Sequence, residues 1–246
     1  MGSEMCIRDR CTLVLNGPEP EQPTGNALLH RLFGAEVVTV TERDLRDPTM
    51  YDVADRIEQE GGRALVVPIG ASTGLGSLGY ATAALELLEQ LDGLDDGCSG
   101  TRLFVSSSSG GTLGGLLLGL GLAGRIDVEI LAVSADTPAA ELRDIGLALA
   151  ADGAGLLTDD PAALLVDIHA VPLTTIDDQV GEGYGIPTDA SRAATADFAQ
   201  LEGIVLDPTY SSKAAAGMIE RVTGADVPDS ERVVFLHTGG AAGLLA

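Results

Sequence analysis

The sequence predicts an α/β fold built from parallel sheets with crossover helices. Short apolar segments, many of them β-branched, alternate along the chain with longer segments of helical character. The 246 residues are enough for one large domain or two smaller ones, and 45% of them are hydrophobic, which suffices for a buried core. Because strand and helix alternate strictly, each helix would carry the chain back to begin another parallel strand.

The segments predicted to be strands are short and apolar. They are residues 12–15, 36–40, 64–67, 103–106, 128–133, 204–206 and 233–236. The longer segments between them are predicted to be helices, over residues 24–33, 50–60, 78–91, 113–122, 139–151, 190–201 and 212–222. A domain boundary is predicted near residues 68–76, where proline and three glycines interrupt the pattern.

The charge and the cysteines exclude several classes of function. The formal net charge of −23 at pH 7 argues against nucleic-acid binding, because a phosphate backbone would be repelled. The most apolar run, residues 113–124, is too short and too rich in glycine to cross a membrane. Cys6, Cys11 and Cys98 lack the spacing of a metal site and predict reduced thiols in the cytoplasm. We expect no metal, no nucleic acid and no membrane partner.

The opening residues 1–10, MGSEMCIRDR, have neither the apolar core nor the cleavage site of a signal peptide. They look like translated sequencing-adapter sequence. We therefore expect residues 1–10 to be non-native and the natural chain to have been cut before Cys11.

The strongest local signal is a turn of serines and glycines directly after the strand predicted at residues 103–106. Its glycines let the backbone approach a ligand, and the helix that follows favours an anion at its N-terminus. The turn has no lysine and no GxxxxGK[ST] pattern, so a single cofactor phosphate fits it better than a nucleoside triphosphate. An ordinary helix cap explains such a string equally well taken alone, but its place beyond a strand end favours a ligand site. The turn consists of Ser106, Ser107, Ser108, Ser109, Gly110, Gly111 and Thr112.

Two further regions hold candidate site residues. The last predicted strand ends at His237 and Thr238, and the Thr238 hydroxyl is suited to hydrogen-bond a pyridine nitrogen without protonating it. A structural histidine and a turn-capping threonine are the competing explanations. Tyr184 and Tyr210 lie in loops flanked by glycine or proline and are candidates for substrate contact. For each tyrosine, a half-buried ring with a bonded hydroxyl is at least as common.

A serine hydrolase is the alternative from another class of enzyme. Residues 70–74, GASTG, match the G-x-S-x-G nucleophile elbow around Ser72, and Asp207 and His237 follow in the order of a hydrolase triad. This pattern arises easily by chance in a chain with 32 glycines. It also leaves the serine-rich turn and both tyrosine loops unexplained.

Five separated strings together resemble one enzyme family: PIGASTGLGSLGY, SSSSGGTLGGLLLGL, GEGYGIPTDASR, LEGIVLDPTYSSKAAAG and FLHTGG. In this order they resemble the D-cysteine desulfhydrase/1-aminocyclopropane-1-carboxylate (ACC) deaminase family of fold-type-II pyridoxal-phosphate (PLP) enzymes, over residues 11–246. The resemblance implies a tryptophan-synthase-β-like fold and a homodimer. It also implies the remainder of a small domain in residues 11–68 and a large PLP-binding domain in residues 69–246. The family usually has glycine at the positions of Ala71 and Ser108.

The resemblance also implies roles for the candidate site residues. Tyr184 and Tyr210 would orient a small amino-acid substrate, and Ser211 and Thr238 would meet the pyridine nitrogen. ACC deaminases typically carry glutamate and a bulky apolar residue at these last two positions, whereas desulfhydrases carry hydroxyls. We therefore expect conversion of D-cysteine to pyruvate, sulfide and ammonia by β-elimination, with ACC deamination as the alternative. The phosphate of PLP would be held by Ser107, Ser108, Ser109, Gly110, Gly111 and Thr112.

Lys213 is the only lysine, since the other 13 of the 14 basic residues are arginines. A PLP enzyme holds its cofactor as a Schiff base on a lysine amine. The resemblance places that lysine upstream of the matched strings and equates Lys213 with a lysine beside the pyridine ring. We therefore expect the catalytic lysine to be absent, the small domain to be incomplete and the chain as given to be inactive.

Overall fold

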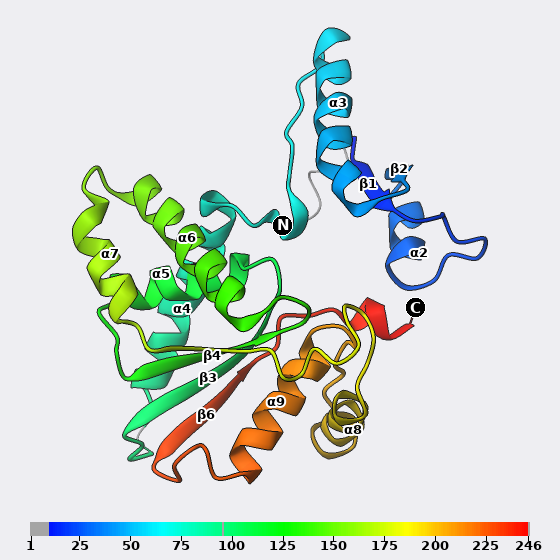
Figure 1. Cartoon of the computed structure of the whole chain (residues 1–246). Helices are drawn as coiled ribbons and strands as arrows, with labels where there is room; N and C mark the ends of the chain where they lie inside the picture. Colours follow the sequence, from blue (N-terminus) through cyan, green and yellow to red (C-terminus); the bar gives the residue numbers. More distant parts are fainter. Residues whose placement is uncertain (1–9, 95, 246) are drawn as a thin grey trace. The chain divides into compact units, whose positions relative to one another are not determined.

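The structure, a computed structural model, describes residues 10–94 and 96–245 (Figure 1). Residues 1–9, which we interpret together with Arg10 as adapter sequence, lie outside the described residues. The chain divides into two compact units. Unit 1 comprises residues 1–68 and 242–246, and unit 2 comprises residues 69–241.

Unit 1 is built on a two-stranded parallel sheet of β1 (Thr12–Asn16) and β2 (Glu36–Val40). Helix α2 (Gly25–Leu32) connects the two strands, and a short 3-10 turn (Arg43–Leu45) leads from β2 into α3 (Arg46–Gln59). The strand–helix–strand connection confirms the crossover predicted for this part of the sequence. A last 3-10 turn covers Ala241–Leu245.

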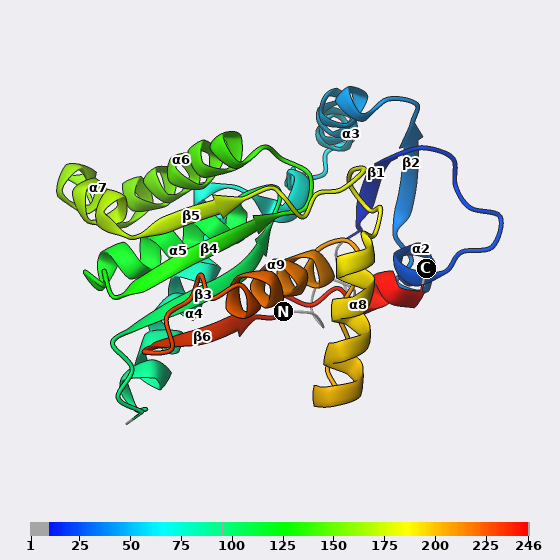
Figure 2. The same cartoon turned by 60° about the horizontal axis from the view of Figure 1, so that its bottom comes forward.

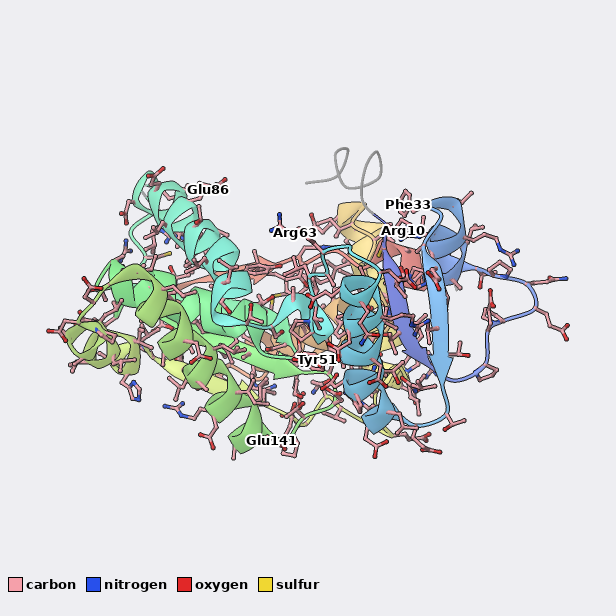
Figure 3. All side chains as sticks on the ribbon, turned by 90° about the horizontal axis from the view of Figure 1, so that it is seen from above. Arg10, Phe33, Tyr51, Arg63, Glu86 and Glu141 are labelled. Carbon is pink, nitrogen blue, oxygen red and sulfur yellow. The ribbon has the colours of Figure 1, made fainter. Side chains whose placement is uncertain are left out.

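Unit 1 has no core of its own. Among the described residues 10–68 none is buried, and Phe33 and Tyr51, both labelled in Figure 3, are 69% and 61% exposed. The strand predicted at residues 64–67 is wrong, because this segment pairs with no strand and Leu65 is 86% exposed. The segment has the apolar, partly β-branched composition of a strand, but it has neither a neighbouring strand to pair with nor a face packed against other residues.

Unit 2 contains a four-stranded sheet in the order β5-β4-β3-β6, in which all pairs are parallel. The strands are β3 (Gly100–Ser107), β4 (Val128–Ser134), β5 (Leu173–Ile176) and β6 (Glu231–Leu236). Figures 1 and 2 show helices α4 to α7 on one face of this sheet and α9 on the other, with α8 beside α9. The predicted architecture of a parallel sheet with crossover helices is therefore confirmed.

The helices of unit 2 agree with the sequence in most places. They are α4 (Gly74–Asp92), α5 (Gly111–Leu122), α6 (Ala139–Leu157), α7 (Pro161–Ala170), α8 (Asp189–Asp197), a π-helical turn (Phe198–Glu202) and α9 (Ser211–Thr223), preceded by a 3-10 turn (Ile69–Ala71). The strand predicted at residues 204–206 is wrong. This segment leaves the π-helical turn through Gly203, which has a φ of 68°, and Val205 remains 45% exposed instead of joining a sheet.

Helix α7 and strand β5 were not predicted, although α7 carries a start signal. The Asp160 side chain caps the helix by accepting a hydrogen bond from the Ala162 N–H at 3.3 Å, and Pro161 occupies the first turn. Strand β5 is only four residues long and half threonine, so its composition resembles that of a loop. It is a strand because it pairs with β4, which its own residues do not predict.

The two central strands of unit 2, β3 and β4, are buried on both faces, as in other parallel sheets. Leu103 and Val105 of β3 point into the core under α4 to α7, whereas Phe104 between them packs with Val133 and Ala214 on the α9 side. This alternation places successive β3 residues on opposite faces, which decides where the serines after Val105 point.

Helix α5 is apolar all round because it is surrounded by other elements. Nine of its residues are buried, and its glycines permit close contact with three neighbours. A Cβ on Gly114 would lie 2.7 Å from Leu149 of α6, and one on Gly121 would lie 2.8 Å from Ile168 of α7. A Cβ on Gly115 would lie 2.3 Å from the Ser77 carbonyl oxygen of α4. Among the described residues, no helix has the length and apolarity to cross a membrane.

The close contact of α4 with α5 gives the first testable prediction. In Gly115→Ala the new methyl group meets the Ser77 carbonyl, which belongs to the backbone and cannot turn away. We expect overpacking to lower the free energy of unfolding by about 1–3 kcal/mol, measured by urea denaturation. Gly79→Ala is the matched control, since Gly79 lies in α4 with no atom within 4 Å of an added Cβ. The control should gain stability, by up to about 1 kcal/mol; equal losses in both variants would contradict the packing.

Candidate active site

The carboxyl ends of β3, β4 and β6 meet at one edge of the sheet of unit 2. Ser107 pairs with Ser134, and Val105 pairs with Leu236. The serine-rich turn after β3, the turn after β4 and Thr238 after β6 therefore follow at the same edge. Open parallel sheets bind their ligands at this edge.

The serine-rich turn has the backbone of an anion site. Gly110 adopts the left-handed conformation, with a φ of 81° and a ψ of −10°, and α5 begins at the next residue. A Cβ on Gly110 would lie 2.4 Å from Ile145 of α6, and a Cβ on Gly111 would lie 2.8 Å from the Ser72 hydroxyl. Both positions therefore require glycine, and the backbone N–H groups at the start of α5 are left to face a ligand.

A second helix begins beside the first. Gly111 lies against Ser72, and Gly115 against Ser77, so α4 and α5 run in the same direction and begin at the same end. The Ser72 hydroxyl donates a hydrogen bond to the Ser109 hydroxyl at 2.7 Å. Thr73 caps α4 by accepting from the Gly76 N–H at 3.0 Å. Two helix N-termini thus favour a negative group at one place.

The hydroxyls of the turn divide into three kinds. Ser106 and Ser107 are buried, and within the described part of the chain their hydroxyls have no hydrogen-bond partner. Ser108 donates to the carboxylate of Asp136 at 2.6 Å, and Ser109 accepts from Ser72. Because buried hydroxyls are nearly always bonded in folded proteins, the unpaired hydroxyl of Ser107, which lies on the same face of β3 as Val105 and α5, indicates a group that binds here. A phosphate fits the glycine backbone, the two helix N-termini and the Ser107 hydroxyl.

The two candidate tyrosines lie together. The hydroxyls of Tyr184 and Tyr210 are hydrogen-bonded, and their ring centroids are 5.7 Å apart at an interplanar angle of 71°. Burial raises the pKa of Tyr210, and the hydrogen bond with Tyr184 raises that pKa further. Tyr184 is 52% exposed. The pair therefore has one partly buried phenol, that of Tyr210, and one exposed phenol, that of Tyr184, which suits contact with a small polar substrate.

The start of α9 is organised by Asp207. Its buried carboxylate accepts hydrogen bonds from the N–H groups of Thr209, Tyr210 and Ser211 at 2.8–2.9 Å. The Ser211 hydroxyl donates to the same carboxylate at 2.6 Å and accepts from the Asp207 N–H at 2.7 Å. The Thr238 hydroxyl, in contrast, has no hydrogen bond to any described residue. Of the two hydroxyls assigned to the pyridine nitrogen, Thr238 is free to donate, whereas Ser211 already donates to Asp207.

The hydrolase triad is not assembled. His237 accepts from the Gly239 N–H through Nδ1 at 3.0 Å and bonds to the Val205 carbonyl through Nε2 at 2.9 Å. With Nδ1 as acceptor, Nε2 carries the proton and cannot act as a base. The Ser72 hydroxyl donates to Ser109, and the Asp207 carboxylate accepts from the backbone N–H of Ser211 in the turn that follows it. In addition, the strand expected before Ser72 does not form, so the geometry of a nucleophile elbow is lacking.

Lys213 is buried, with 1% of its surface exposed. Its ammonium group donates to the carbonyls of Ala135 at 3.3 Å, Val180 at 2.8 Å and Gly183 at 2.9 Å. An ammonium has three N–H donors, so all of them are used. Burial lowers the pKa of Lys213, and the Asp136 carboxylate opposes this shift. Sequence reasoning did not find these contacts, because they join residues far apart in the chain.

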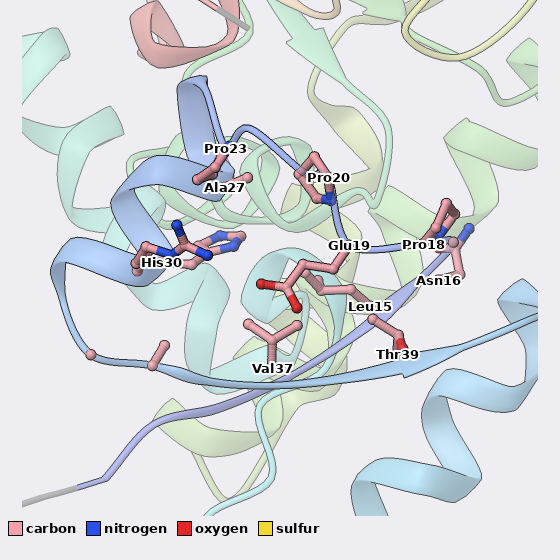
Figure 4. A pocket seen from close by; sticks show the side chains of 14 residues that line it. Leu15, Asn16, Pro18, Glu19, Pro20, Pro23, Ala27, His30, Val37 and Thr39 are labelled. Atoms are coloured by element: carbon pink, nitrogen blue, oxygen red, sulfur yellow. The ribbon is translucent and has the colours of Figure 1, made fainter.

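A hollow of about 330 Å³ lies elsewhere, in unit 1. Glu19 and His30 extend into it from opposite sides (Figure 4), and both are accessible to solvent. It contains no buried polar group without a partner among the described residues, so it lacks the signs of a ligand site seen at the sheet edge. No cluster of possible metal ligands occurs in the described parts of the chain.

Comparison with known proteins shows the family of the chain. A family model described as pyridoxal-phosphate dependent enzyme matches residues 8–239. The chain belongs to this family of PLP-dependent enzymes. Its relatives include D-cysteine desulfhydrases of Salmonella typhi and Salmonella newport (strain SL254), each 36% identical over 244 residues. These matches cover 96% of this chain and 70% of each relative.

Solved structures support the same fold. A crystal structure of an ACC deaminase homologue is similar with a TM-score of 0.77 and 25% identity, covering 96% of this chain and 68% of that one. Serine racemase from Dictyostelium discoideum has a TM-score of 0.58 at 18% identity, covering 96% of this chain and 70% of that one. The predicted PLP fold type II is thus confirmed, as are PLP as the cofactor and a PLP-dependent lyase as the class of enzyme.

The serine-rich turn of residues 106–112, which we call the phosphate cradle because we propose that it holds the phosphate of PLP, gives the second prediction. A side chain at Gly110 is strained by about 1–2 kcal/mol in the left-handed conformation and meets Ile145. We expect Gly110→Val and Gly111→Val to raise the dissociation constant for PLP or inorganic phosphate about tenfold or more. Ser106→Ala leaves the backbone of the turn unchanged and should have a smaller effect. Equal losses in all three variants, measured by fluorescence or calorimetric titration, would argue against binding by the backbone of the turn.

Lys213 gives the third prediction. Its amine is buried and bonded to three carbonyls, so it cannot attack the cofactor aldehyde without breaking these contacts. After incubation with PLP and reduction with borohydride, peptide mass mapping should show no stoichiometric label on Lys213. A single labelled peptide containing Lys213, together with turnover of an amino acid, would show that it is the catalytic lysine.

Proposed function

We propose that this chain provides the PLP-binding unit of a lyase that eliminates sulfide from D-cysteine. One observation carries the proposal: the phosphate cradle and the free hydroxyl of Thr238 lie at the same edge of the sheet. The identity of 36% to D-cysteine desulfhydrases supports the choice of substrate. The products would be pyruvate, sulfide and ammonia.

In this proposal different residues of unit 2 bind the phosphate, the pyridine nitrogen and the substrate. The N–H groups at the start of α5 and the Ser107 hydroxyl would hold the phosphate. Thr238 would donate a hydrogen bond to the pyridine nitrogen and would leave it uncharged. Tyr184 and Tyr210 orient the substrate, and Tyr210 remains protonated because burial and Tyr184 raise its pKa. Bound PLP supplies electron withdrawal from the substrate Cα, which allows a good β-substituent such as sulfide to leave.

The lysine that binds the cofactor aldehyde is not among these residues. Lys213 is the only lysine of the sequence, and its three N–H groups are bonded to carbonyls. We therefore propose that the reactive amine comes from outside these 246 residues, and that the sequence as given binds PLP but does not turn over substrate.

ACC deamination is the second candidate, favoured by the likeness to the ACC deaminase homologue. The residues at positions 211 and 238 distinguish the two reactions. A carboxylate beside the pyridine nitrogen would keep it protonated, whereas a hydroxyl would not. Neither Ser211 nor Thr238 carries a carboxylate, and Thr238 has the free hydroxyl, which supports β-elimination.

The fourth prediction tests the reaction in a chimera. The matched region of the Salmonella typhi D-cysteine desulfhydrase is replaced by the matched residues of this chain, so that the relative supplies the remainder. We expect the chimera to release sulfide from D-cysteine faster than ammonia from ACC. Ser211→Glu with Thr238→Leu should shift the ratio of the two kcat/KM values toward ACC, by about tenfold or more if one charge-assisted hydrogen bond is gained.

Two controls make this result interpretable. The Gly111→Val chimera should lose both activities together, because it affects the cofactor and not the choice of substrate. A chimera that binds PLP and prefers ACC from the start would refute the desulfhydrase assignment. An unchanged ratio after the double substitution would show that these two positions do not select the reaction.

Homodimer assembly and a cytoplasmic location remain proposals. Cys11 and Cys98 are free thiols, which fits a reducing compartment. The molar mass in solution, from light scattering, tests the dimer.

A further inference from the structure

The loop that carries Tyr184 has little to fix it locally. Gly181, Gly183 and Gly185 all have positive φ values, of 65°, 144° and 73°. This turn makes few backbone hydrogen bonds with described residues: the Val180 N–H donates to the Asp177 carbonyl, and the Ile186 N–H donates to the Gly183 carbonyl, both at 3.3 Å. A loop of this composition has many alternative conformations, so an outside contact must select the one observed.

Lys213 supplies that contact. It lies in the first turn of α9, three residues after Tyr210, and its ammonium group donates to the carbonyls of Val180 and Gly183. Gly183 directly precedes Tyr184. The third N–H points to the Ala135 carbonyl after β4, so the ammonium is anchored on the sheet edge as well. One buried side chain thus joins the segments that carry the two tyrosines.

We propose that Lys213 is a positioning residue whose ammonium group holds the Tyr184 loop so that the Tyr184 hydroxyl meets that of Tyr210. Its part in catalysis rests on the function proposed above, but the hydrogen bond between the phenols does not. A methionine at this position would leave the buried Ala135 carbonyl and the part-buried carbonyls of Val180 and Gly183 without donors, and the loop would move to hydrate them. Tyr210 would then lose the partner that Tyr184 provides.

The proposal is tested by titrating the tyrosines, which requires neither cofactor nor turnover. The four tyrosines are labelled with ¹³C at Cζ and followed by NMR as the pH is raised. Tyr210 faces the Tyr184 hydroxyl and the charges of Asp136 and Asp207, all of which raise its pKa in addition to burial. If Tyr184 no longer pairs with Tyr210, Tyr210 should therefore titrate at lower pH.

In Lys213→Met we expect the Tyr210 midpoint to fall by about one pH unit or more. Tyr184→Phe should lower it similarly, since the partner hydroxyl is gone. The double variant should behave like Tyr184→Phe alone, because Lys213 acts through Tyr184. Additive shifts, or an unchanged midpoint in a folded Lys213→Met protein, would overturn the proposal.

Ser212→Ala is the matched control for general destabilisation of α9. Ser212 is buried in the same turn, and its hydroxyl bonds to Thr195 at 2.6 Å and not to the tyrosine loop. It should leave the Tyr210 midpoint unchanged; a fall equal to that of Lys213→Met would mean that Lys213 merely stabilises the helix. If Lys213→Met does not fold, Lys213→Gln replaces it. The Gln amide keeps two N–H donors, so it should give a smaller fall, and no fall would refute the proposal.

These outcomes are separate from those of the chimera. Failure of the sulfide assay with a Tyr210 midpoint that depends on Lys213 would reject the function and keep the positioning role. The opposite result would keep the function and reject the role of Lys213.

Discussion

The close contact between α4 and α5 is the constraint on which the site of unit 2 depends. Gly115 and Gly119 permit this contact, since a Cβ on either would lie 2.3–2.5 Å from a carbonyl oxygen of α4. The contact fixes where both helices begin, and so it brings Ser72 within hydrogen-bond distance of Ser109. A larger residue in the middle of α5 would therefore disturb not only the core but also the two N-termini that we propose face the phosphate.

This arrangement explains how an acidic protein can bind an anionic cofactor. The chain has a net charge of −23, and neither the serine-rich turn nor the segment at residues 70–74 contains a lysine or arginine. The carboxylate of Asp136 even accepts a hydrogen bond from Ser108 in the turn. Attraction must come from short-range groups, namely backbone N–H donors, helix N-termini and hydroxyls. Such groups act over a few ångströms, whereas exposed charges farther away than the Debye length, about 8 Å at physiological ionic strength, are largely screened.

The sequence predicted those parts of the molecule that depend on local rules. The strand, glycine turn and helix around Gly110 follow from residue types in direct succession, and the parallel sheet follows from alternation. The two false strands, at residues 64–67 and 204–206, have strand-like composition but no neighbouring strand to pair with. The hydrogen bond between Tyr184 and Tyr210, and the three carbonyls around Lys213, join separate loops and helices. No local pattern encodes such pairs.

The environment of Lys213 also shows why residue type alone does not define a catalyst. A reactive lysine needs a deprotonated amine with a free path to its electrophile. Burial lowers the pKa of Lys213 and so favours the neutral amine, which taken alone would suggest a nucleophile. Its three carbonyl partners decide otherwise, because each of them stabilises an N–H donor and together they occupy every direction of the ammonium group. The same burial that would make a lysine reactive in an open pocket therefore makes this one a fixed point for the tyrosine loop.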